Sequence, residues 1–137
     1  MEPILASTSI FSFLACSIKN FIEKVNKTGS VKTLINNSGF GKFDKIENAS
    51  TVDWDEMMTV NLRGAFIMSK AFIPSMKKIK KGNIIFINSV AGRHGYPFSA
   101  GYVASKFGLR GLAESLRNEL RKDNIKVTSI YPGAVDS

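Results

Sequence analysis

Apolar and polar residues follow two different periods along this chain. Short apolar runs of strand length, bounded by turn residues, predict buried strands over residues 31–35, 83–88 and 124–130. Apolar residues at three- and four-residue steps predict helices over residues 20–27, 51–82 and 102–122. A loop is expected from Phe40 to Ala49 and another from Val90 to Gly101. The predicted elements therefore alternate between helix and strand.

The second helix carries its own start and stop signals. Ser50-Thr-Val-Asp53 has the spacing of a capping box, with Asp in place of Glu, and predicts that a helix follows. Pro74 lies inside the helical pattern, where its ring should kink or interrupt the helix. Gly82 is expected to end the helix.

Alternating strands and helices predict an α/β fold with a parallel sheet and right-handed crossovers. Ligands of such open sheets bind beyond the carboxyl ends of the strands. All the predicted strands end in polar or turn residues: Asn36-Asn37-Ser38-Gly39, Asn88-Ser89 and Pro132-Gly133. We therefore expect these residues to meet at one rim of the sheet, close to Tyr102 at the start of the last helix.

Composition and charge narrow the class of protein. The chain has 137 residues, of which 44% are hydrophobic, so it is long enough for one globular domain. A single cysteine, Cys16, excludes an internal disulfide and fits the cytoplasm; no role is assigned to it. The segment 4–14 is too short and too polar for a membrane span, and Glu2 stands where a signal peptide would be basic.

The net charge of +8 raises the alternative of a nucleic-acid binder. The densest basic run, Lys77 to Lys81, lies where a helix should end, and the helix dipole favours cations there. No aromatic residues are interleaved with that run. A solvated helix end is therefore the better interpretation, and no nucleic-acid or membrane partner is predicted.

Tyr102 and Lys106 form the pair with the clearest chemistry. They lie four residues apart on a predicted helix, so their side chains share one face. A nearby ammonium stabilises a phenolate, which makes Tyr102 a candidate proton donor and acceptor. Carbonyl and alcohol redox reactions need a group of this kind. On their own, a tyrosine and a lysine at this spacing are more often an ordinary surface pair.

Further motifs strengthen the functional interpretation. Over residues 18–137 the chain resembles the short-chain dehydrogenases/reductases, and the resemblance implies a partial Rossmann-like, doubly wound parallel sheet of about three strands with flanking helices. The matching pieces are Asn36-Asn37-Ser38-Gly39, Val60-Asn61, Asn88-Ser89, Tyr102-Val-Ala-Ser-Lys106 and Pro132-Gly133-Ala134-Val135-Asp136-Ser137. Ser38 stands where the family usually has alanine, and Ser137 replaces a threonine.

The resemblance implies an NAD(P)(H)-dependent oxidoreductase that interconverts a carbonyl and an alcohol, of the 3-oxoacyl-thioester or ketone reductase type. Tyr102 would be the acid and base, Lys106 would support it, Ser89 would polarise the carbonyl, and Asn61 would hold a relay water. Residues implied at the NAD or NADP site are Asn37, Gly39, Tyr102, Lys106, Pro132, Gly133 and Ser137. The substrate would be a small carbonyl or alcohol, and no metal site is predicted.

The resemblance also has gaps. The Gly-rich turn that holds the cofactor pyrophosphate in this family has no counterpart before Gly29, and the family's C-terminal end is also missing. Residues 1–17 are interpreted as an atypical segment before a partial domain at 18–137. One hypothesis is that residues 4–14 pair along the open edge of the first strand or pack over it. The alternative function is an inactive fragment that keeps an association surface, with a homodimer or tetramer formed through helices 61–81 and 102–122.

Two remaining residues receive structural interpretations. His94, the only histidine, lies in a Gly-rich loop and is expected to be exposed to solvent. Trp54 is expected to pack against a helix or in the core.

Overall fold

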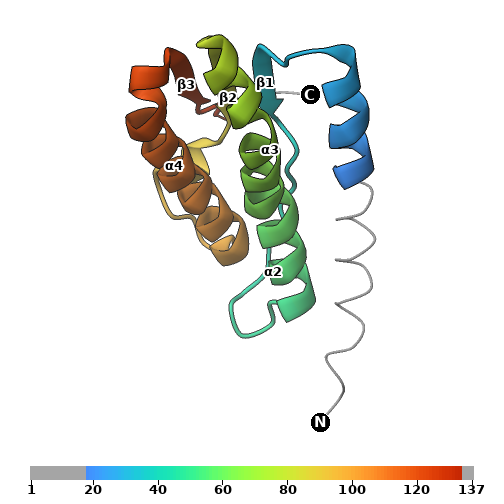
Figure 1. Ribbon diagram of the computed structural model, residues 1–137. Helices are drawn as coiled ribbons and strands as arrows, with labels where there is room; N and C mark the ends of the chain where they lie inside the picture. The colour runs from blue at the N-terminus through green and yellow to red at the C-terminus, as the bar shows by residue number, and fades with distance from the viewer. Residues whose placement is uncertain (1–17, 134–137) are drawn as a thin grey trace. The chain divides into compact units, whose positions relative to one another are not determined.

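The computed structural model describes residues 18–133 and divides the chain into two compact units, Met1–Val31 and Lys32–Ser137 (Figure 1). In the first unit residues 18–28 are helical, which confirms the predicted helix. The Thr28 hydroxyl donates a hydrogen bond of 2.8 Å to the Val25 carbonyl, next to the predicted stop. Cys16, Ser137 and the predicted pairing of residues 4–14 lie outside the described residues, and the domain boundary at residue 18 stays a prediction.

The second unit is built on a parallel three-stranded sheet with the order β1-β2-β3. The strands are β1 (Thr33–Asn36), β2 (Gly82–Ile87) and β3 (Ile125–Ile130). Their register aligns Ile35 of β1 with Ile85 of β2, and Ile85 with Thr128 of β3. The three predicted strands and the α/β class are confirmed, and β1 and β3 form the edges of the described sheet.

Helices α3 (Gly64–Ile79) and α4 (Ala100–Leu120) lie side by side across one face of this sheet (Figure 1). Side chains on β2 alternate, so Ile84 and Phe86 point toward the helices and are fully buried. Within the described part of this unit, Ile35 and Ile130 on the other face remain 58% and 46% exposed. The core therefore lies between the sheet and the two helices. None of the helices over residues 18–133 is long and apolar enough to cross a membrane.

The predicted second helix begins as expected but changes geometry at a different place. Ser50 caps α2 (Thr51–Met57), because its hydroxyl accepts hydrogen bonds from the backbone N–H groups of Val52 and Asp53. A π-helical segment, Met58–Arg63, then leads into α3. An interruption at Pro74 is wrong, since α3 continues through it, and the alternative of a kink there stays a prediction. Pro74 and Lys70 are both exposed, so water can bind the Lys70 carbonyl that has lost its donor.

The stop expected at Gly82 is also wrong. The helix ends at Ile79, Lys80 takes a left-handed conformation with φ of 48°, and Gly82 is the first residue of β2. A Cβ atom at Gly82 would lie only 2.6 Å from the Met76 sulfur and 3.0 Å from the Met76 Cβ. Glycine is needed there because strand and helix approach closely, not because the helix ends.

The basic run at the end of α3 agrees with the solvated interpretation. The Lys77 ammonium lies 3.6 Å from a Glu119 carboxylate oxygen and 3.4 Å from one of Asp123. These ion pairs tie the end of α3 to the end of α4 and the following turn.

Two glycine substitutions should have opposite effects on stability. Gly82→Ala should lower the free energy of unfolding by roughly 1–3 kcal/mol, because the new methyl group overpacks against buried Met76. Gly111→Ala should raise it by about 0.5–1 kcal/mol, because Gly111 is exposed inside α4 and a Cβ meets nothing within 4 Å. Urea unfolding followed by circular dichroism measures both. Equal effects of the two substitutions would contradict the packing at Gly82.

Candidate active site

Asn61 joins the turn after β1 to α4. It is 1% exposed and lies in the π-helical segment. Its Oδ1 accepts a hydrogen bond of 3.0 Å from the Phe40 N–H, and its Nδ2 donates to the Phe40 carbonyl at 2.8 Å. The same Nδ2 donates to the Ser105 hydroxyl at 3.0 Å, and that hydroxyl donates to the Tyr102 carbonyl at 2.7 Å. One buried amide therefore holds a loop and a helix together.

Lys106 lies at the meeting point of the same elements. Lys106 is 4% exposed, and its ammonium donates a hydrogen bond of 3.2 Å to the Ile87 carbonyl at the end of β2. A Cβ atom on Gly39 would lie 3.4 Å from the Lys106 Nζ and 3.3 Å from the Asn61 Oδ1. Burial lowers the pKa of the Lys106 ammonium below its ordinary value of 10.5.

The Tyr102 ring contacts both Lys106 and the loop after β1. The Lys106 Nζ lies 5.6 Å from the centre of the ring, so the shared helix face predicted from the sequence is present. The Phe43 ring meets Tyr102 edge to face, with ring centres 5.8 Å apart. Gly41 leaves room for this arrangement, because a Cβ there would lie 2.5 Å from the Phe43 ring.

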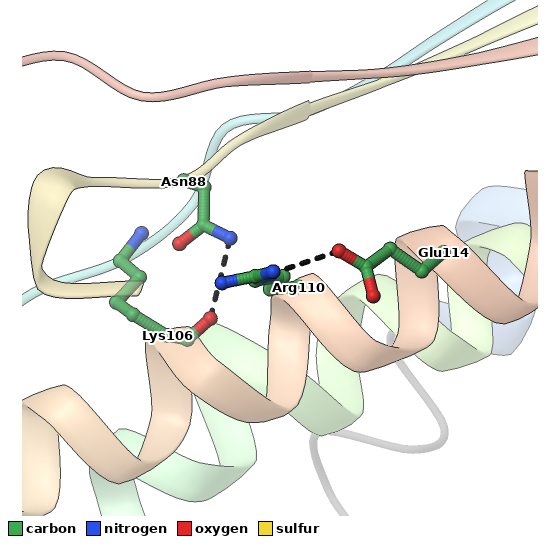
Figure 2. A network of polar contacts seen from close by, with 4 residues as sticks. All are labelled: Asn88, Lys106, Arg110 and Glu114. Atoms are coloured by element: carbon green, nitrogen blue, oxygen red, sulfur yellow. Dashed lines mark hydrogen bonds and ion pairs between the residues drawn. The ribbon is translucent and has the colours of Figure 1, made fainter. Parts of the chain in front are cut away.

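Ser89 follows β2 and is positioned by its neighbours. Asn88 is buried, and its Nδ2 donates to the Lys106 carbonyl at 3.2 Å (Figure 2). Its Oδ1 accepts from the Ser89 N–H at 3.0 Å. The Ser89 hydroxyl accepts a hydrogen bond from the Ala91 N–H. No hydrogen bond over residues 18–133 joins Ser89 to Tyr102 directly. Asn88 is therefore the link between Ser89 and the helix that carries Tyr102.

The predicted cofactor residues differ in how close they lie to Lys106 and Ser89. Gly39 faces Asn61 and Lys106, with no side chain of its own to obstruct a ligand. The Pro132 carbonyl accepts from the Val90 N–H at 3.1 Å, which brings the end of β3 beside Ser89. Asn37 and Gly133 are exposed at the same rim, and Asn37 makes no hydrogen bond with a described residue. The Lys106 ammonium uses one of its three N–H groups, so it can still donate to ligand hydroxyls.

Sequence reasoning missed several residues that organise this site. Ser105 stands three residues after Tyr102, where a serine hydroxyl can bond back to the helix, and this spacing was the available signal. Asn88 stood at a predicted strand end and in the Asn88-Ser89 motif, but neither signal showed that its amide is buried and bonds to α4. The contact of Phe43 with Tyr102 had no signal in the sequence, because it depends on how the loop folds back.

The structure also places His94 and Trp54, for which the sequence indicated no catalytic role. His94 is exposed in its loop, as predicted. Trp54 is 40% exposed on α2, and a Cβ on Gly101 would lie 3.3 Å from its ring, so it covers the start of α4.

The buried ammonium of Lys106 predicts a pH dependence of stability. Its pKa is lower in the folded protein than in the unfolded chain, so its charge costs stability at neutral pH. That cost disappears as the pH rises from the folded pKa to the unfolded value of 10.5. The wild type should therefore gain free energy of unfolding relative to Lys106→Met between pH 7 and about pH 10. Urea unfolding at both pH values measures the difference, with exposed Lys78→Met as the control. A wild type that instead loses stability relative to Lys106→Met would refute it.

Comparison with known proteins agrees with this geometry. Residues 15–137 match the family model described as short chain dehydrogenase. The chain is 39% identical over 111 residues to a sepiapterin reductase of Chlorobaculum tepidum, covering 81% of this chain and 46% of that protein. It is 35% identical over 121 residues to the 3-oxoacyl-[acyl-carrier-protein] reductase FabG of Thermotoga maritima, covering 88% and 49%.

Solved structures give the same result. An alcohol dehydrogenase from the archaeon Thermococcus sibiricus, complexed with 5-hydroxy-NADP, superposes with a TM-score of 0.82 at 31% identity, over 90% of this chain and 52% of that one. A gluconate 5-dehydrogenase from Burkholderia cenocepacia, in complex with NADP and tartrate, gives a TM-score of 0.81 at 27% identity, over 85% and 46%. The chain spans about half the length of these relatives. The sequence match, the parallel sheet and the site geometry together show that the chain belongs to the short-chain dehydrogenase family.

Proposed function

We propose that this chain carries the proton-transfer site of an NAD(P)(H)-dependent reductase that interconverts a carbonyl and an alcohol. The observation that carries the proposal is the buried Lys106 ammonium, which lies 5.6 Å from the centre of the Tyr102 ring at the rim of the sheet. Because the relatives are about twice as long, the activity is proposed for the assembled site of which these residues form part.

Tyr102 is the proposed acid and base. In the direction of reduction, its phenol donates a proton to the substrate oxygen, and in the direction of oxidation the phenolate takes the proton back. Lys106, whose Nζ lies 5.6 Å from the centre of the Tyr102 ring, is the residue proposed to support Tyr102 in this role. The Phe43 ring packs against the Tyr102 ring with ring centres 5.8 Å apart, which limits rotation of the Tyr102 side chain.

Lys106 and Asn61 are proposed to return the proton to Tyr102. Burial lowers the Lys106 pKa, so its ammonium releases a proton more readily than an exposed lysine does. Both amide N–H groups of Asn61 are already donated, to Phe40 and Ser105. A relay water would therefore be held by a carbonyl oxygen of Asn61. The Asn61 side chain itself positions Lys106, because it holds the turn after β1 against α4.

Ser89 is proposed to donate its hydroxyl proton to the substrate oxygen and so to polarise the carbonyl. The oxygen of that hydroxyl already accepts from Ala91, which leaves its proton free to point toward a ligand. A bound nicotinamide cofactor would supply or accept the hydride. The residues proposed to hold that cofactor are Asn37, Gly39, Tyr102, Lys106, Pro132, Gly133 and Ser137.

The substrate class proposed is a 3-oxoacyl thioester or another small ketone. The relative from Thermotoga maritima is named as a 3-oxoacyl-[acyl-carrier-protein] reductase, and the one from Chlorobaculum tepidum as a sepiapterin reductase. Both relatives are named as reductases. The Tyr102 and Lys106 pair supports that reaction type, while NAD and NADP remain alternative cofactors.

Substitution of Tyr102 tests the proposal. Tyr102→Phe should lower kcat for reduction of an acetoacetyl thioester by about 10²–10⁴-fold, because the proton donor is lost. Binding of NADPH and NADH, followed by nicotinamide fluorescence, should change by only a few-fold, because the ring remains. Tyr96→Phe is the matched control, since Tyr96 is exposed in the loop before α4.

Two outcomes would contradict this function. Equal turnover by Tyr102→Phe and the wild type would remove Tyr102 from its role. An absence of cofactor binding at millimolar NADPH and NADH would favour the alternative, a fragment that only associates through its helices.

A further inference from the structure

The Tyr102 hydroxyl makes no hydrogen bond with any residue that the structure describes, so no such bond fixes its place. The hydroxyl oxygen lies on the long axis of the ring, so a flip of the ring about that axis leaves the oxygen where it is. Only the torsion about the Cα–Cβ bond moves it, and that torsion has three staggered values. The packing of the Tyr102 ring therefore decides where the hydroxyl lies.

Among the described residues, the Tyr102 ring has two close contacts, and one of them comes from outside α4. The Lys106 ammonium is on the same helix, 5.6 Å from the ring centre, and donates its hydrogen bond to Ile87. The Phe43 ring belongs to the loop after β1 and meets the Tyr102 ring at an interplanar angle of 67°. This edge-to-face arrangement is one that aromatic rings favour. Phe43 is therefore the contact that can select the position of the Tyr102 ring from outside the helix.

The backbone is anchored on both sides of Phe43. The Lys42 N–H donates a hydrogen bond of 3.3 Å to the Met57 sulfur, and the Asp44 N–H donates one of 2.8 Å to the Phe98 carbonyl. Phe98 has a φ of 61°, in the left-handed region that a bulky residue rarely adopts, so its surroundings hold it there. The bond from Asp44 ties the loop after β1 to the loop that leads into α4. These anchors fix the base of the Phe43 side chain relative to the start of α4.

Gly41 controls the direction of the Phe43 ring. A Cβ atom on Gly41 would lie 2.5 Å from the Cζ atom of that ring and 3.0 Å from its Cε2 atom. The φ of Gly41 is outside the left-handed region, so alanine can adopt the same backbone. The obstructed atoms are the far end of a side chain that is 64% exposed, so a methyl group would push the ring aside and leave the core intact. The chain thus offers a substitution that breaks the ring contact while both rings remain.

We propose that Phe43 is a positioning residue for Tyr102: from its anchored loop, the Phe43 ring holds the Tyr102 ring in one staggered position and so aims the phenol. This inference rests on the proposed proton-transfer role of Tyr102. An aromatic pair favours its own geometry by about two- to tenfold, which is enough to make one position of the ring dominant. Phe43 acts only through Tyr102 and needs no contact with the reacting atoms.

NMR of the whole chain tests the positioning without any enzymatic turnover. The chain has three tyrosines, so labelled tyrosine gives three sets of signals, which Tyr96→Phe and Tyr131→Phe assign. In the wild type, the couplings between the Hα and Hβ protons of Tyr102 should have the limiting values of a single staggered torsion. Phe43→Leu and Gly41→Ala should each move these couplings to intermediate, averaged values and shift the Tyr102 ring signals.

A matched glycine substitution controls for general effects on the loops. Gly95→Ala places a methyl group in the loop before α4, where a Cβ meets nothing within 4 Å, so the Tyr102 couplings should not change. Circular dichroism should show the same fold for all the variants, since Phe43 is largely exposed.

Kinetics with an acetoacetyl thioester test the consequence for the reaction. Phe43→Leu and Gly41→Ala should each lower kcat by about tenfold, because the proton donor remains but is aimed at the substrate for only part of the time. The KM for NADPH should change less than twofold. Phe43→Tyr keeps an aromatic ring at this position, so its kcat should stay within twofold of the wild-type value, and Gly95→Ala should behave in the same way.

The proposal is overturned if the Tyr102 couplings are already averaged in the wild type, or if neither Phe43→Leu nor Gly41→Ala changes them. It is also overturned if the couplings change while kcat does not, because the position of the ring would then not matter for proton transfer. A wild type with no turnover would instead contradict the proposed function, and the couplings would still decide whether Phe43 holds the Tyr102 ring.

Discussion

The buried amide of Asn61 is the interaction on which the candidate site depends. Its hydrogen bonds to Phe40 and Ser105 hold the turn after β1 against α4. Lys106 and Tyr102 lie on that helix, and Gly39 lies in that turn. A buried amide left without partners costs about 1–3 kcal/mol, so the site is most stable when the loop, the π-helical segment and the helix are all in place around Asn61.

Packing explains why this polar cluster can exist in so small a unit. Helices α3 and α4 cover one face of the sheet and bury Phe72, Met76 and Leu109 against it. The apolar core lies beneath the middle of the strands, and the polar groups gather at their carboxyl ends. In the described part of the unit, Ile35 and Ile130 on the other face stay substantially exposed. The chain spans about half the length of its relatives.

Much of the fold could be predicted because local signals agreed with one another. The strand-length runs, the Ser50 cap and the helical stripe before Lys122 each gave an element within a few residues of its observed bounds. The errors came where a residue type has more than one use. Pro74 was read as a helix breaker, but it is exposed and tolerated. Gly82 was read as a stop, but it makes room for Met76.

The sequence by itself determined the order of elements, the parallel sheet and the pairing of Tyr102 with Lys106 on one helix face, because these depend on periodicity and short spacings. Only the tertiary structure decided which side chains secure the site. The Asn61–Ser105 bond spans 44 residues along the chain, and the Phe43 ring reaches Tyr102 through a folded loop. Contacts between segments distant in sequence leave no periodic signal, since they arise only when the crossovers place the elements side by side.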